Sequence, residues 1–229
     1  MSGGLLDDSG ALRSNMPEEP VYRITLVRHC ESVGNADGKV QGHADSPLSE
    51  RGRAQARALA RRWQTEGIAF DHVITSPLVR ARETAAIIAA PMGFAHPEID
   101  SLWMEHDSRA HPVTRLDEPT KPTPQPGDSS GEDPAAARGE SDEALFLRGR
   151  RALQSILERP PARYLAVSHR AILNTIVCAI LDIGPRPGLQ PAALFRLANG
   201  SISRFRYFPL AGRWQADVIG DRSHWKFDA

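Results

Sequence analysis

The stretch Tyr22-Arg23-Ile24-Thr25-Leu26-Val27-Arg28-His29-Cys30 decides the fold of this chain. Its apolar first part predicts a buried β-strand, and Arg28 and His29 stand where that strand ends. In an open α/β sheet, ligands bind at the carboxyl ends of the strands. An imidazole that can act as a nucleophile, next to a guanidinium that can hold an oxyanion, therefore indicates a site for a phosphorylated substrate. The tripeptide alone is weak evidence, because a histidine after a strand can also serve only in packing.

The composition predicts a single domain without an obvious macromolecular partner. The chain has 229 residues, of which 41% are hydrophobic, which is enough for one substantial core. Its 28 basic and 28 acidic residues balance, so the usual electrostatic argument for a nucleic-acid or membrane partner is missing. Two cysteines do not make a disulfide framework, and we expect a cytoplasmic protein. Residues 1–20 lack the basic and apolar parts of a secretory signal and are predicted to form a flexible N-terminal tail.

Strand and helix patterns alternate over residues 21–229. Apolar residues at helical spacing follow Ser49 up to Gly67, and Ser76-Pro77 predicts the cap of another helix that runs to about Ala90. Further signals predict strands at 71–75 and 163–167, helices at 144–157 and 172–181, and a hairpin in which Asn199-Gly200 turns between strands 193–197 and 201–208. The alternation predicts an α/β fold, a three-layer α/β/α sandwich around a mixed, mainly parallel sheet.

A change of composition marks residues 107–140, where prolines alternate with glycine, serine and acidic residues. Few of these side chains could build a core, which predicts a long, partly disordered loop. A loop of this length inside a domain can be a lid, a binding loop or simple disorder, and the sequence leaves these alternatives open.

Residues suited to phosphoryl transfer recur at the ends of the predicted elements. The strand at 163–167 delivers His169 to its end, as the first strand delivers His29, and the helix after Ser76 begins with Arg80 and Arg82. A phosphomonoester needs donors around its non-bridging oxygens, a nucleophile in line with the leaving oxygen, and an acid that protonates the departing alkoxide. Arg80 and Arg82 lie two positions apart on one helix and cannot both face one pocket.

Three blocks of the chain resemble the histidine phosphatase superfamily, the proteins with the phosphoglycerate mutase-like fold, and the resemblance spans most of residues 22–208. The first block is Arg28-His29-Cys30-Glu31-Ser32, continued by Asn35, Gln41-Gly42 and residues 47–52. The second is residues 76–85, and the third is Val167-Ser168-His169.

The resemblance implies a phosphatase that hydrolyses phosphomonoesters through a phosphohistidine on His29. It selects Arg80 rather than Arg82, and it implies that the phosphoryl group is held by Arg28, Asn35, Gln41, Arg80 and His169. Glu105 is the predicted general acid, and its alternative is an exposed surface glutamate. A neutral imidazole is nucleophilic and fixed arginines neutralise the transferring group, so we expect neither a metal nor a cofactor. The other histidines also lack the spacing of metal ligands.

The chain departs from the family pattern in three places. Cys30 and Arg170 stand where the family commonly has glycine, and residues 106–109 lack the glycine and the Glu-Gly pair of many members. In addition, Gly34 stands where the mutases have tryptophan. Cys30 is either a buried inert thiol or an oxidisable one that controls activity, and Arg170 either approaches the phosphate or points into solvent.

Gly34 favours a phosphatase over the alternative, a cofactor-dependent phosphoglycerate mutase. A second alternative is a non-catalytic module that binds phosphorylated ligands, which depends on whether Glu105 acts as an acid. The expected partner is a small phosphorylated substrate, with no nucleic acid and no membrane. The sequence does not decide which substrate is bound or whether the chain forms a homodimer.

Overall fold

The first apolar run forms a central strand of the sheet. In the computed structural model, which describes residues 19–107, 139–185 and 193–225, β1 (Tyr22–Arg28) lies between β4 (Arg163–Ser168) and β5 (Ile202–Phe208). The strand order is β3-β2-β4-β1-β5-β6, completed by β2 (His72–Thr75), β3 (Glu98–Ile99) and β6 (Arg213–Asp221). The strand pairs from β3 to β1 are parallel, whereas β5 pairs antiparallel with both β1 and β6. The predicted mixed, mainly parallel sheet is therefore confirmed.

Four longer helices connect these strands. They are α2 (Glu50–Thr65), α3 (Val79–Ala89), α4 (Asp142–Leu157) and α5 (Arg170–Ile180). Ser49 caps α2 and Ser141 caps α4, each by accepting a backbone N–H three residues further on, which is why these helices begin there. Three short segments of one turn complete the described elements: α1 (Val33–Ala36), η1 (Ala90–Met92) and η2 (Ser101–Trp103).

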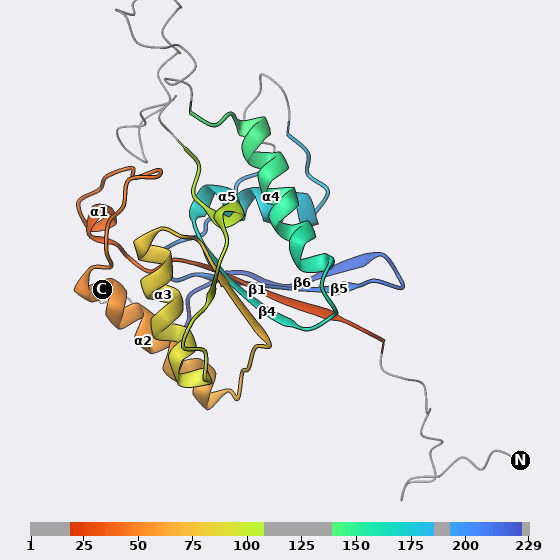
Figure 1. Ribbon diagram of the computed structural model, residues 1–229, viewed down its shortest axis with the longest axis horizontal. Helices are drawn as coiled ribbons and strands as arrows, with labels where there is room; N and C mark the ends of the chain where they lie inside the picture. Colours follow the sequence, from red (N-terminus) through yellow and green to blue (C-terminus); the bar gives the residue numbers. More distant parts are fainter. Residues whose placement is uncertain (1–18, 108–138, 186–192, 226–229) are drawn as a thin grey trace, which may run out of the picture.

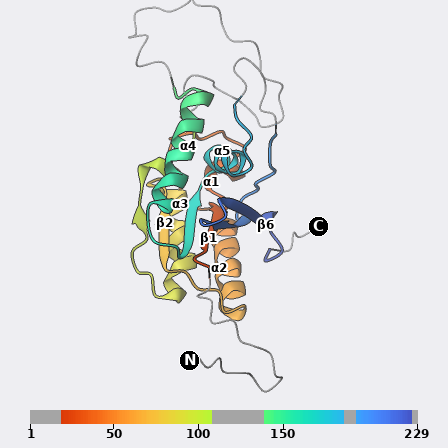
Figure 2. The same ribbon diagram turned by 90° about the vertical axis from the view of Figure 1, so that its right-hand side faces the viewer.

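The helices cover both faces of the sheet. Side chains alternate along a strand, so Ile24 and Leu26 of β1 pack with α4 and α5, whereas Val27 packs with α2 and α3. α2 lies beside α3 and α4 lies beside α5, with the sheet between the two pairs (Figures 1 and 2). This is the three-layer α/β/α arrangement. In the part of the chain that the structure describes, no helix is long and apolar enough to cross a membrane.

The predicted hairpin at Asn199-Gly200 is wrong. Residues 193–197 form no strand, and β5 instead pairs with β1 and with β6, a strand that the sequence pattern did not predict. Gly200 does adopt the left-handed backbone expected of a turn (φ 71°), but its N–H donates to the carbonyls of Arg28 and His29. The turn therefore closes against the end of β1 rather than between two paired strands.

Two predictions concern residues that the structure does not describe. These are the flexible N-terminal tail, of which residues 1–18 lie outside the described ranges, and the proline-rich loop, of which residues 108–138 lie outside them.

Candidate active site

The two histidines lie side by side because they follow neighbouring parallel strands. Arg28 of β1 is in register with Ser168 of β4, and the backbone N–H of His29 donates to the carbonyl of Ser168 at 2.8 Å. The ring centroids of His29 and His169 are 5.1 Å apart, and both side chains are buried. The sheet thus brings together two imidazoles that are 140 positions apart in the chain.

The hydrogen bond of His29 defines its tautomer. Its Nδ1 lies 2.7 Å from the carbonyl oxygen of Cys30, which can only accept, so Nδ1 carries the proton and Nε2 carries the lone pair. Burial lowers the pKa of His29 well below its usual value of 6.5, and the charges of Arg28 and Arg80 lower it further. His29 is therefore a neutral imidazole whose Nε2 can act as a nucleophile near neutral pH.

The half-buried Arg28 and the buried Arg80 supply positive charge to the site. Arg28 donates to the carbonyl of Leu197 at 2.7 Å, and Arg80 donates to the carbonyls of Gly42 and Ala44 at 2.7 and 2.8 Å. In both arginines Nε is buried without a partner, and neither side chain forms an ion pair within the described ranges. Burial lowers the pKa of Arg28 to about 10 and lowers that of Arg80. Arginines that have no carboxylate bonded directly to them favour an anionic ligand.

Arg80 and Arg82 take different directions, as the helical geometry requires. Arg80 is 1% exposed, whereas Arg82 lies on the exposed side of α3.

His169 is held by Ser76, which was predicted from the sequence to cap a helix instead. Its Nε2 lies 2.8 Å from Oγ of Ser76, while its Nδ1 is buried without a partner. The prediction that Ser76 caps α3 is wrong, because Leu78 occupies the N-cap and no side chain caps that helix. When the Ser76 hydroxyl donates to Nε2, the proton of His169 is on Nδ1, where it can be donated to a phosphoryl oxygen. Burial lowers the pKa of His169, and the charges of Arg80 and Arg28 lower it further.

Glu105 lies close to Arg28 and Arg80. Its charge raises the pKa of both Arg28 and Arg80, against the lowering by burial. Its Oε1 accepts the backbone N–H of His106 at 2.9 Å and that of Ala171, near the start of α5, at 3.1 Å. The side chain is half-buried, unlike a surface glutamate in open solvent.

Arg148 of α4 fastens the segment that carries Glu105. Its guanidinium donates to the carbonyls of Leu102, Met104 and Glu105 and forms an ion pair with Glu140 at 2.6 Å. One side chain thereby ties three backbone positions to α4. This role of Arg148 could not be predicted from the sequence, because arginines are common on helix surfaces.

Asn35 and Gln41 meet at Ser32, next to His29. Asn35 Oδ1 accepts the N–H and the hydroxyl of Ser32, and Gln41 Nε2 donates to the same hydroxyl at 2.8 Å. Asn199 donates to Asn35 Oδ1 at 2.9 Å and to the carbonyl of His29 at 3.2 Å, so it joins this group to His29. Sequence reasoning missed Asn199 because Asn-Gly is so strong a turn signal. The amide N–H groups of Asn35 have no partner among the described residues and can still donate to a ligand.

The absence of a side chain at Gly34 leaves room for the side chain of Gln41. A Cβ at position 34 would lie 2.6 Å from Cδ and 2.8 Å from Oε1 of Gln41, closer than real Cβ contacts. A larger residue at this position would therefore displace Gln41.

Arg170 is another position at which the chain departs from the family pattern. Its side chain is exposed at the first position of α5, and its charge contributes to lowering the pKa of Arg28. No group of three or more His, Cys, Asp or Glu residues suited to a metal ion occurs within the described ranges.

Cys30 is expected to be inert towards oxidation. Its side chain is fully buried, burial raises the pKa of its thiol to about 12, and only a thiolate reacts readily with peroxide. Peroxide treatment is therefore expected to leave turnover unchanged, and peptide mass spectrometry should find Cys30 unmodified until the protein is unfolded. A loss of turnover that thiol restores, together with a modified Cys30, would show instead that this thiol controls activity.

The buried histidines predict a fall of stability on acidification. The unfolded chain protonates each histidine near pH 6.5, whereas folded His29 and His169 stay neutral to lower pH because their pKa values are lowered. Below that pH the unfolded state binds more protons, so the free energy of unfolding decreases by up to about 1.4 kcal/mol per pH unit and histidine. Urea unfolding of wild type and His29→Gln should show a shallower decrease for the variant. The exposed residue His96 provides the control, His96→Gln. Parallel curves for all three proteins would contradict the neutral state of His29.

Comparisons with known proteins agree with this geometry. Residues 24–221 match the model of the family described as "Histidine phosphatase superfamily (branch 1)". A protein of Enterobacter sp. (strain 638), named "Probable phosphoglycerate mutase GpmB", is 37% identical over 213 residues, which cover 89% of this chain and 95% of that protein. The solved structure of Bacillus stearothermophilus YhfR has a TM-score of 0.67 at 28% identity and covers 89% of this chain and 98% of its own. Mycobacterial glucosyl-3-phosphoglycerate phosphatase Rv2419c, in a complex with VO3, has a TM-score of 0.64 at 22% identity, covers 87% of this chain and 98% of its own, and shows likeness of fold alone.

Proposed function

Because this chain belongs to the histidine phosphatase superfamily (branch 1), we propose that it is a metal-independent phosphatase that hydrolyses phosphomonoesters through a phosphohistidine on His29. The observation that carries the proposal is the neutral, Nδ1-protonated His29 beside the guanidiniums of Arg28 and Arg80, which have no carboxylate bound to them in the described structure. A phosphoryl group supplies the negative charge that these guanidiniums lack.

The first step transfers the phosphoryl group to His29. Nε2 forms a bond to phosphorus while the bond to the leaving oxygen breaks, and Glu105 donates a proton to the departing alkoxide. Arg28, Arg80 and His169 Nδ1–H hold the non-bridging oxygens as charge moves onto them. In the second step a water attacks the phosphohistidine, and the Glu105 carboxylate accepts its proton. The P–N bond breaks and returns His29 to its neutral form.

The space around Gly34 supports hydrolysis over the mutase reaction. A mutase must retain the phosphoenzyme and recapture a bisphosphate, and in this chain the side chain of Gln41 fills the position next to Gly34. The second candidate is nevertheless a cofactor-dependent phosphoglycerate mutase, since relatives at 37% identity carry the name of a probable phosphoglycerate mutase. A non-catalytic phosphate-binding module is the third, and the position of Glu105 near both arginines argues against it.

One assay separates the three candidates. Phosphate release is measured from an activated aryl phosphate and from 3-phosphoglycerate with a chelator present, and isomerisation of 3-phosphoglycerate is measured with a bisphosphoglycerate primer. A phosphatase releases phosphate despite the chelator. A mutase isomerises faster than it hydrolyses, and a binding module does neither. Loss of phosphate release on chelation would contradict the metal-independent reaction.

Replacing Glu105 by glutamine is expected to slow substrates with poor leaving groups most. An alkyl alkoxide needs protonation and should leave about a hundredfold more slowly or worse, whereas an aryl phosphate needs little help from an acid. The kcat for an alkyl and an aryl phosphate measures this ratio. The exposed residue Glu158 provides the matched control, Glu158→Gln, in which both rates should be preserved. Equal losses on both substrates in Glu105→Gln would remove the acid role from Glu105.

A further inference from the structure

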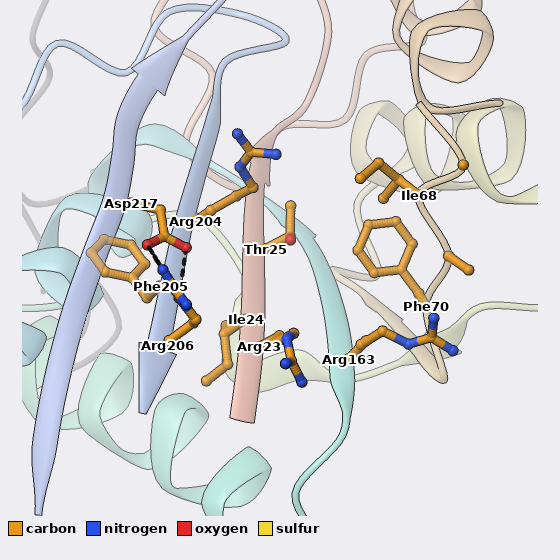
Figure 3. A pocket seen from close by; sticks show the side chains of 12 residues that line it. Arg23, Ile24, Thr25, Ile68, Phe70, Arg163, Arg204, Phe205, Arg206 and Asp217 are labelled. Atoms are coloured by element: carbon orange, nitrogen blue, oxygen red, sulfur yellow. Dashed lines mark hydrogen bonds and ion pairs between the residues drawn. The ribbon is translucent and has the colours of Figure 1, made fainter. Parts of the chain in front are cut away.

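A second charged pocket lies at the other end of the sheet from His29. It has a volume of about 510 Å³ and lies at the start of β1 and β4, beside residues 67–70 that follow α2. Figure 3 shows Arg23, Arg163, Arg204 and Arg206 around it. We call this the arginine pocket. Since His29 follows the last residue of β1 and Arg23 is its second, about six residues of extended strand, roughly 20 Å, separate the two sites.

The strand pairing places three of these arginines in one row. Arg23 of β1 is in register with Arg163 of β4 on one side and with Arg206 of β5 on the other. Arg204 follows on the same face, opposite Thr25. Like charges directly opposite each other in a sheet are destabilising. A row of this kind therefore lowers stability unless anions compensate it.

Carboxylates compensate only Arg163 and Arg206, which lie on the two strands that flank β1. Asp71 pairs with Arg163 at 2.6 Å, and Asp217 pairs with Arg206 at 2.8 Å. The side chains of Arg23 and Arg204 make no hydrogen bond or ion pair with any described residue, and Nε of Arg204 is buried without a partner. Arg23, which is exposed, and Arg204, which is half-buried, thus have no anionic partner among the described residues.

The remaining walls suit a small organic molecule. Ile68 and Phe70 form an apolar side, next to the hydroxyl of Thr25 (Figure 3). A volume of about 510 Å³ falls within the range of small-molecule sites. Among the described residues that line the pocket there is no histidine or cysteine, and its carboxylate, Asp217, is paired with Arg206, so the pocket offers no nucleophile like His29 and no free acid like Glu105.

We propose that the arginine pocket binds a small organic anion with a diphosphate or triphosphate group. The phosphate chain contacts Arg23 and Arg204, and the organic part lies against Ile68 and Phe70. Guanidiniums bind phosphate oxygens in pairs, and a chain of linked phosphates carries enough negative charge to compensate a row of cations where a single carboxylate does not. The ligand is bound there without being hydrolysed. The inference goes beyond the phosphatase reaction and does not depend on it.

The test measures melting temperatures with inorganic tripolyphosphate, ADP or citrate as the probe. All proteins carry His29→Ala so that no probe is turned over. Against this background, the variant Arg23→Ala/Arg204→Ala is compared with a control that loses two exposed arginines elsewhere, Arg57→Ala/Arg150→Ala. A probe at a hundredfold excess over its Kd should raise the melting temperature by about 5 °C or more.

Tripolyphosphate and ADP are expected to raise the melting temperature of the parent and of the control, and to raise that of the pocket variant distinctly less. Without any probe, the pocket variant should unfold in a single cooperative transition like the parent, which shows that it is folded. Equal shifts in all three proteins would place the bound anion elsewhere, for instance at Arg28 and Arg80, and overturn the proposal. A pocket-dependent shift with citrate as large as with tripolyphosphate would overturn the assignment of a phosphate chain.

Discussion

Replacing His29 with alanine is expected to abolish phosphate release, with a loss on the order of 10,000-fold or more. His29 is the group whose Nε2 carries a lone pair beside Arg28 and Arg80, and alanine leaves no atom to bond to phosphorus. Steady-state hydrolysis of an aryl phosphate measures the loss. His96→Ala is the matched control, because His96 is exposed and outside the group of residues around His29.

The variant should still bind phosphate. Arg28, Arg80 and His169 stay in place in His29→Ala, so inorganic phosphate should inhibit or stabilise it much as it does wild type. Hydrolysis that persists at a tenth of the wild-type rate or more would show that another group attacks phosphorus. Loss of both turnover and phosphate binding would instead indicate that the variant has lost the site as a whole.

Replacing Arg80 with lysine is expected to reduce kcat/KM by roughly a hundredfold to a thousandfold. Arg80 reaches two loop carbonyls, those of Gly42 and Ala44, and still has a buried Nε without a partner. A lysine ammonium is a single point charge that cannot bind these carbonyls and the phosphoryl oxygens in the same geometry.

Arg82→Lys is the control for this substitution, since it changes the same chemical group on the same helix at an exposed position. Its kcat/KM should stay within a factor of two or three of wild type, because exposed substitutions away from a site change little. Similar losses in Arg80→Lys and Arg82→Lys would trace the effect to α3 as a whole. Wild-type rates in Arg80→Lys would move the phosphate contact to another cation.

The residues at the strand ends, His29 and His169, are the part of the site that could be predicted from the sequence. Hydrophobic runs predict strands, and parallel neighbours place the residues that follow them at one edge, so His29 and His169 were expected together and lie together. Helical geometry likewise required that Arg80 and Arg82 diverge. These inferences depend on local periodicity, which the chain displays directly.

The contacts between segments far apart in the chain could not be predicted. Ser76 and Asn199 carry the local signals of a helix cap and a turn, but tertiary contacts direct Ser76 to His169 and Asn199 to Asn35 and His29. The strand β6 was missed because its side chains are only partly buried, so its apolar alternation is weak. Local propensity describes a segment alone, whereas these residues are defined by what packs against them.

The most direct test of the account is to trap the phosphoenzyme. The protein is mixed with an activated aryl phosphate, quenched in denaturant at alkaline pH, where phosphohistidine survives, and its peptides are analysed by mass spectrometry. We expect one phosphoryl group on the peptide that contains His29, absent from His29→Ala and lost on mild acid treatment. Hydrolysis without any phosphorylated peptide, or with the phosphoryl group on another residue, would contradict the central claim that His29 is the nucleophile.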